Sequence, residues 1–227
     1  MLNKKILFLC SGGGGNLRFI HHALKNNWLP RWSKISVIAD RECPATDYAR
    51  GSFLTTTCMD FTQNEQNDLL DRALLENPDI IVTTVHRILR APLLNTFDGR
   101  LLNLHYSLLP SFGGSIGSTP VRSALSYGAC VTGVTVHRVT AELDGGQPQV
   151  QVAIPISRDD DLDQTIDVVF RAGCIALFTA LSQISTPSAV NMKGVNLYIK
   201  DRNALINPAV VLPKEFADEI FWQSLNL

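Results

Sequence analysis

The feature that most constrains this fold is a regular alternation of short apolar runs with amphipathic segments. The run KKILFLC at 4–10 has the composition of a strand, and NLRFIHHALKNN at 16–27 repeats apolar residues at helical spacing. Strand patterns recur at 35–40, 79–85 and 100–105, and a second helix pattern covers 66–76. This order predicts an α/β fold with an open, doubly wound, mostly parallel sheet.

The second half of the chain continues the pattern less regularly. Residues 119–128 predict a helix, 133–140 and 151–156 predict partner strands, and 161–184 predicts one long helix. From Pro187 onward the pattern is irregular, apart from a last amphipathic helix predicted within 213–225. We therefore expect a Rossmann-like catalytic domain over 1–190 and a short irregular C-terminal extension over 191–227, packed on the same domain.

Composition excludes several classes of protein. The 227 residues are 45% hydrophobic, which is enough for one α/β core, and the net charge of -1 provides no basic surface for nucleic acid or an anionic membrane. No apolar stretch reaches the roughly 18 residues of a spanning helix, and the first apolar run is shorter than a signal peptide requires. We expect a cytoplasmic monomer or homodimer that binds neither nucleic acid nor membrane.

The cysteines argue against covalent or metal crosslinks. Their number is odd, and no two have C-x-x-C spacing: Cys10, Cys43, Cys58, Cys130 and Cys174. This arrangement is typical of small buried side chains in a reducing compartment. We expect no disulfide framework and no metal site.

Ligands of doubly wound sheets bind beyond the carboxyl ends of the strands, where the segment CSGGGGN follows the first strand. Glycines allow close backbone approach, and the next helix begins with free N–H groups, so Gly13, Gly14, Gly15 and Asn16 predict a phosphate site. The segment is neither a P-loop nor a dinucleotide fingerprint, because Gly-Lys-Ser/Thr is missing and Leu17 replaces the last glycine. A tight turn without a ligand is the alternative, but four glycines exceed what a turn needs.

Two further strand ends carry polar side chains. Asn103 and His105 are two residues apart in a strand and therefore share a face, although a lone strand histidine is more often a core residue. An amide beside an imidazole can stabilise an oxyanion and transfer its proton. Asp144 follows a later strand; it either makes a simple Asp-Gly turn or orients His105 and stabilises its protonated form. Together the three residues predict acyl transfer without a covalent nucleophile.

These residues lie in motifs that resemble a known family. NLHYSLLPSFGG and GVTVHRVTAELDGG are similar to the signature and the Asp loop of the folate-dependent formyltransferases. LCSGGGGNL resembles the phosphate loop of the glycinamide ribonucleotide branch of that family, and VHRILRAPLLNTFDGRLLN resembles its pterin-binding segment. The resemblance extends over about residues 5 to 185. It implies the formyltransferase fold and formyl transfer from 10-formyltetrahydrofolate to a primary amine, by default glycinamide ribonucleotide of purine biosynthesis.

The resemblance also implies roles for individual residues. Asn103 would hold the formyl oxygen, His105 would stabilise the oxyanion, and Asp144 would pair with His105. Gly13, Gly14, Gly15 and Asn16 would bind a phosphate of the amine substrate. The pterin would be bound by two backbone segments and an apolar lining: His86, Arg87, Ile88, Leu89, Leu94, Leu101, Val139, Thr140 and Ala141.

Departures from the family pattern affect the amine substrate. The family's ribonucleotide enzymes carry a Glu-His pair near Cys174 and Ile175, and a proline where this chain has Tyr106. The segment GGSIGSTPVRSAL also differs from its His-rich counterpart. An amino sugar or another phosphorylated amine is therefore the alternative acceptor.

Other activities fit the sequence less well. Methionyl-tRNA formyltransferases carry a C-terminal domain that about 40 residues after the long helix cannot form. Formyltetrahydrofolate hydrolases carry an N-terminal regulatory domain ahead of the first strand. A non-catalytic binding module would not need Asn103, His105 and Asp144 together, and a nicotinamide dehydrogenase would need the missing fingerprint.

Overall fold

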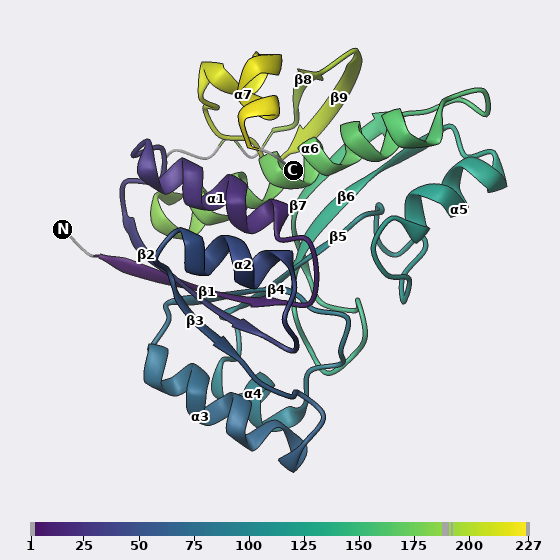
Figure 1. Ribbon diagram of the computed structural model, residues 1–227. Coiled ribbons are helices and arrows are strands. Elements are labelled where there is room, and N and C mark those ends of the chain that lie inside the picture. The colour runs from purple at the N-terminus through teal and green to yellow at the C-terminus, as the bar shows by residue number, and fades with distance from the viewer. Residues whose placement is uncertain (1–2, 188–190, 192, 226–227) are drawn as a thin grey trace. The chain divides into compact units, whose positions relative to one another are not determined.

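The computed structural model describes residues 3–187, 191 and 193–225 (Figure 1). The chain forms two compact units. Unit 1 contains residues 3–103 and Arg138–Leu143, and unit 2 contains Leu104–His137 and the described residues from Asp144 onward.

Unit 1 is built on parallel strands in the order β3-β2-β1-β4-β5. Helices α1 and α2 cover one face of this sheet, and α3 and α4 cover the other (Figure 1). The elements are β1 Lys4–Cys10, α1 Gly15–Lys25, β2 Trp32–Ala39, α2 Pro44–Gly51, β3 Thr55–Cys58, the 3-10 helix η1 Asn64–Gln66, α3 Asn67–Glu76, β4 Ile80–Thr84, α4 Ala91–Thr96 and β5 Leu101–His105. The predicted doubly wound arrangement is confirmed.

Burial of β1 on both faces explains its central position. The five side chains from Ile6 to Cys10 are at most 1% exposed, and the strand pairs with β2 on one side and β4 on the other. The chain runs outward from β1 to β2 and β3, and then returns to place β4 on the other side of β1. The loops after β1 and β4 therefore meet at the topological switch point, where doubly wound sheets bind ligands.

Two helices of unit 1 were not predicted because their sequence signals are weak. In α2 the buried face consists of Ala45, Thr46 and Ala49, which are too small or too polar to give an apolar period. The helix is nevertheless well defined at its start by Pro44 and by mutual hydrogen bonds between Cys43 and Thr46. The other helix, α4, has only six residues.

Unit 2 contains antiparallel strands in the order β6-β7-β9-β8. Its elements are α5 Thr119–Tyr127, β6 Val131–Arg138, β7 Pro148–Pro155, α6 Leu162–Ser185, β8 Val195–Ile199, β9 Arg202–Asn207, the 3-10 helix η3 Lys214–Ala217 and α7 Glu219–Ser224. The C-terminal extension is more regular than expected, because β8 and β9 form a hairpin that pairs with β7. Alternating exposed and buried residues in β9 are too few to predict a strand.

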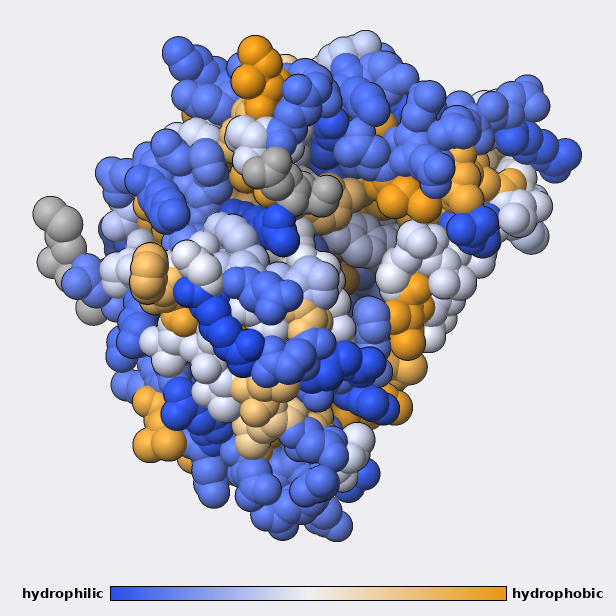
Figure 2. Space-filling view, viewed as in Figure 1, coloured by the Kyte–Doolittle hydropathy of each residue, from blue (hydrophilic) through white to orange (hydrophobic). Residues whose placement is uncertain are grey.

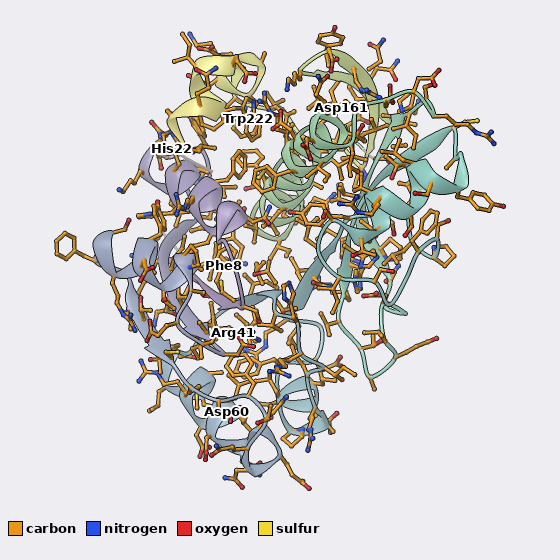
Figure 3. The ribbon with its side chains drawn as sticks, turned by 45° about the vertical axis from the view of Figure 1, so that its right-hand side comes forward. Phe8, His22, Arg41, Asp60, Asp161 and Trp222 are labelled. Carbon is orange, nitrogen blue, oxygen red and sulfur yellow. The ribbon has the colours of Figure 1, made fainter. Side chains whose placement is uncertain are left out.

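Helix α6 corrects one expectation from the sequence. Asp161, labelled in Figure 3, caps the helix by accepting the N–H of Gln164 at 2.9 Å. Between Val168 and Ser185, Arg171 is the only charged residue, so α6 is long and apolar enough to cross a membrane, contrary to the expectation that no stretch is. Because 78% of its most apolar window is buried, we interpret α6 as a core helix.

The surface agrees with the balanced composition. Hydrophilic residues cover much of the face seen in Figure 2, with smaller hydrophobic patches between them. Scattered exposed apolar side chains are normal for a soluble protein and do not mark an interface by themselves.

A buried arginine attaches the C-terminal segment to α6. The guanidinium of Arg171 donates two hydrogen bonds to the carboxylate of Glu219, at 2.6 and 2.8 Å, and one to Asp167 at 3.0 Å. It also lies 5.2 Å from the ring centre of Trp222, which Figure 3 labels. The hydrogen bond from Arg171 holds the pKa of Glu219 below its ordinary value of 4.5.

We predict that Arg171→Ala lowers the free energy of unfolding by about 1.5–3 kcal/mol at pH 7, because charged hydrogen bonds and packing are lost. The pKa of Glu219 is depressed in the folded state, so this contribution is present above about pH 4.5 and is lost as the pH falls through the folded value. Urea unfolding at several pH values measures it, with the exposed Arg31→Ala as control. If the difference in the free energy of unfolding between the wild type and Arg171→Ala grows as the pH falls, the assigned role of the Arg171–Glu219 pair is wrong.

Candidate active site

Asp144 is the centre of the candidate site in unit 2. Its side chain is 9% exposed, and Oδ2 accepts the N–H of Gly114 at 2.8 Å. The same oxygen lies 3.4 Å from Nδ1 of His105, and Oδ1 lies 3.5 Å from Nε2 of His137. Asp144 has a φ of 53°, a left-handed conformation that Asp tolerates better than most residues. The turn thus directs one carboxylate at two histidines.

His105 is the last residue of β5 and is almost completely buried. Its Nε2 lies 3.1 Å from the carbonyl oxygen of Phe112, while Nδ1 faces Asp144. Both ring nitrogens therefore face oxygen atoms, so the imidazole can donate from either one. Fixed acceptors on both sides also define the orientation of the ring.

The turn after His105 is held by hydroxyl groups. Thr135 of β6 donates to the carbonyl of Ser107 at 2.8 Å and accepts the N–H of Leu109 at 3.0 Å. The hydroxyl of Ser107 donates to the carbonyl of Ser111. These bonds fix the backbone on the C-terminal side of His105.

Asn103 precedes His105 by two residues in β5, the spacing that places side chains on one face of a strand. It is half-buried, and it is the last residue of this segment of unit 1. The prediction that the Asn103 amide and the His105 imidazole share one face therefore depends on β5, which spans Leu101–His105.

The loop after β4 carries the expected pterin-binding segment, His86 to Leu89, within unit 1. The buried side chain of Gln66 donates to the carbonyl of Ile88 at 2.9 Å and accepts the N–H of Arg90 at 2.8 Å. This double hydrogen bond fixes the path of the segment. Gln66 was not predicted, since it lies 22 residues away in sequence.

The expected apolar lining divides into two groups. Leu89, Leu94 and Leu101 belong to one buried cluster of unit 1, and Val139 packs against it. Ile88, in contrast, is 72% exposed. Thr140 and Ala141 are exposed as well, just after Val139, whose N–H donates to the carbonyl of Leu101.

The glycine loop adopts an open conformation before α1. Gly14 has a φ of 74°, and a Cβ at that position would lie 2.8 Å from Ala45. Gly12 and Gly13 have open space around them, and Gly15 and Asn16 form the first turn of α1. Ser11 accepts the N–H of His86 at 3.0 Å, which joins this loop to the pterin-binding segment at the switch point.

A charged cluster beside the glycine loop was not predicted. Asp40 follows β2 and binds Arg41 at 2.7 and 3.0 Å, with Arg87 at 3.5 Å (Arg41 is labelled in Figure 3). Burial opposes ionisation of Asp40, but hydrogen bonds from Arg41 and Ser11 outweigh it and hold the pKa of the carboxyl below its ordinary value. The sequence signal that could have indicated this cluster is the pair Asp40-Arg41 directly after an apolar strand.

His137 was also missed, although it stands seven residues before Asp144 in the Asp-containing motif. Its neighbours Val134 and Val136 made the segment look like an ordinary core strand. No group of three or more His, Cys, Asp or Glu side chains suited to a metal ion occurs among the residues that the structure describes.

Comparison with known proteins identifies similar chains. Residues 4–181 match the family model described as Formyl transferase. Phosphoribosylglycinamide formyltransferase of Mycobacterium tuberculosis (strain ATCC 25618 / H37Rv) is 34% identical over 187 residues, 78% of this chain and 85% of that protein. The protein of the same name from Escherichia coli (strain K12) is 32% identical over 164 residues, 70% and 76% of the two chains. The crystal structure of glycinamide ribonucleotide transformylase 1 from Symbiobacterium toebii is similar, with a TM-score of 0.74 and 27% sequence identity. The match covers 84% of this chain and 91% of that chain.

We predict opposite outcomes for two neighbouring glycines. Gly14→Ala should lower the free energy of unfolding by about 1–3 kcal/mol, because it places a side chain in a left-handed conformation against Ala45. Gly13→Ala, the matched control, should leave stability unchanged because open space surrounds it. Thermal unfolding of both variants measures this, and equal melting temperatures would contradict the conformation of the loop.

Proposed function

Because the chain belongs to the formyl transferase family, we propose that it transfers the formyl group of 10-formyltetrahydrofolate to the amine of glycinamide ribonucleotide. The observation that carries this proposal is the buried carboxylate of Asp144 directed at His105, with Asn103 two residues earlier in β5. We take the acceptor amine from the names of the similar proteins, which are phosphoribosylglycinamide formyltransferases. The reaction would be a cytoplasmic step of purine biosynthesis.

The proposed mechanism gives each residue one role. Asn103 donates its amide hydrogen to the formyl oxygen, which becomes negative when the amine attacks the formyl carbon. His105 stabilises the same oxygen and, directly or through water, moves the proton that the amine loses toward the folate nitrogen that leaves. Asp144 orients His105, and His137 holds the other carboxylate oxygen.

The same proposal assigns the folate to unit 1. The backbone of His86 to Leu89, fixed by Gln66, would hydrogen-bond the pterin. Thr140 and Ala141 would contact it from the Asp loop. Ile88 offers exposed apolar surface that a pterin would cover, whereas Leu89, Leu94, Leu101 and Val139 would form the base beneath it.

The glycine loop would bind the phosphate of the amine. Gly13, Gly14, Gly15 and Asn16 stand where backbone N–H groups and the positive end of α1 favour an anion. Open space at Gly13 leaves room for close approach. Arg41 adds a cation nearby, oriented by Asp40.

A different phosphorylated amine is the second candidate acceptor. On α6, Gly173, Cys174 and Ile175 are buried, and they supply no carboxylate for sugar hydroxyls. An amino sugar or another phosphorylated amine whose hydroxyls are bound elsewhere would need no carboxylate there. In either case we assign activity to residues 1–190 and treat 191–227 as an extension of the same catalytic domain, in a monomer or homodimer.

We predict that Asn103→Ala, His105→Ala and Asp144→Asn each lower kcat about a hundredfold to a thousandfold, because each removes stabilisation of one transition state. The losses should be strongly non-additive. A folate analogue at a hundredfold excess over its Kd should still stabilise the variants by about 2.7 kcal/mol. Steady-state formyl transfer and thermal shifts measure the two effects.

The matched control is His22→Gln. His22, which Figure 3 labels, belongs to α1 and lies outside the proposed site. It should keep full activity. Folded, folate-binding His105→Ala protein with unchanged turnover would return His105 to the role of a core histidine.

We predict that Gly13→Val raises KM for glycinamide ribonucleotide and leaves folate affinity unchanged, because it blocks approach to the loop without straining it. Assays of the wild type with a panel of amines, including nucleotide-linked amino sugars, identify the acceptor. If Gly13→Val weakens both substrates equally, the loop has a structural role and binds no phosphate.

A further inference from the structure

A glycine in the middle of α6 lies against the residue that follows His105. A Cβ built at Gly173 would lie 2.9 Å from Cε1 of Tyr106 and 3.0 Å from Cδ2 of Leu104. Contacts between ordinary side chains are longer than this, so the ring and the leucine occupy the space that any larger residue would need. The three residues all belong to unit 2.

Glycine is a poor choice for the interior of a helix unless close packing requires it. Gly173 stands near the centre of the 24 residues of α6, far from either cap, and it is buried. No turn or positive φ explains it. The close approach of the Tyr106 ring is therefore the feature that requires a glycine here.

The position of Tyr106 connects this contact to the site. Leu104 and Tyr106 flank His105 in the sequence and both contact the surface of α6 at Gly173. On the C-terminal side, Thr135 fixes Ser107 and Leu109. His105 therefore lies between two residues that pack on α6, Leu104 and Tyr106, and just before a turn that hydrogen bonds hold.

We propose that Tyr106 is a positioning residue for His105: its ring, seated at Gly173, fixes the end of β5 so that the imidazole meets Asp144 and the carbonyl of Phe112. This inference rests on the proposed role of His105 in formyl transfer. Tyr106 itself touches no reacting atom in this account. It acts because a displaced backbone at 106 would move His105 out of its contacts at 3.4 and 3.1 Å.

The test combines an inserted methyl with a removed ring. Gly173→Ala should lower kcat by up to about a hundredfold, the scale of a misplacement near 1 Å, with KM for 10-formyltetrahydrofolate unchanged. Tyr106→Ala should lower kcat similarly, and Tyr106→Phe, which keeps the ring, should retain it. The double variant Gly173→Ala/Tyr106→Ala should be no slower than Tyr106→Ala alone, because the inserted methyl then meets only the flexible end of Leu104, which can move into the space left by the ring.

The matched control is Leu181→Ala, a buried residue of α6 about two turns further along. It should lower the melting temperature and leave kcat unchanged in the folded fraction. Tyr106→Ala inserts nothing into the helix, so it tests the inference even where Gly173→Ala does not fold.

Two outcomes separate the proposals. If His105→Ala abolishes turnover but Tyr106→Ala and Gly173→Ala keep kcat, or if the double variant shows the product of the two losses, Tyr106 does not position His105. If His105→Ala keeps full turnover, the proposed function itself fails and the contact at Gly173 has a packing role.

Discussion

The burial of one carboxylate organises this protein's candidate chemistry. A carboxylate that leaves water must be compensated by donors, and Asp144 has three groups around it: the N–H of Gly114 and the rings of His105 and His137. The first two come from the turn at 105–114, and the third comes from the end of β6. The turn at 105–114, the end of β6 and the Asp loop must therefore all be correctly formed before the carboxylate is satisfied, which couples folding of unit 2 to the geometry of the site.

A second polar group plays a comparable part in unit 1. Asp40 binds Arg41 and Arg87 after β2 and β4, and Ser11 accepts the N–H of His86 between the loops after β1 and β4. The glycine loop and the proposed pterin-binding segment are thus joined by direct bonds. Their mutual position follows from the order of the parallel strands, because the switch point brings these strand ends together.

Sequence reasoning predicted elements of the fold where local patterns are strong, and it missed contacts between distant residues. The apolar period of β1 and α6 and the two-residue spacing of Asn103 and His105 are local properties, so strands, helices and candidate residues were predicted from them. Gln66 and Asp40 act through partners 22 and 47 residues away, which no local period records. The hairpin of β8 and β9 was missed for the same reason, since it becomes a regular element by pairing with β7.

Glycines near the site show how the chain determines distance by removing atoms. At Gly14 a Cβ would meet Ala45, at Gly133 it would lie 1.9 Å from the carbonyl oxygen of Val152, and at Gly173 it would meet Tyr106. In each case the missing side chain sets how closely a backbone or a ring approaches a neighbouring element. Such contacts tolerate no larger residue without a shift of the neighbouring atoms. Tyr106 and Gly173 therefore depend on each other: the ring needs the space that the glycine leaves.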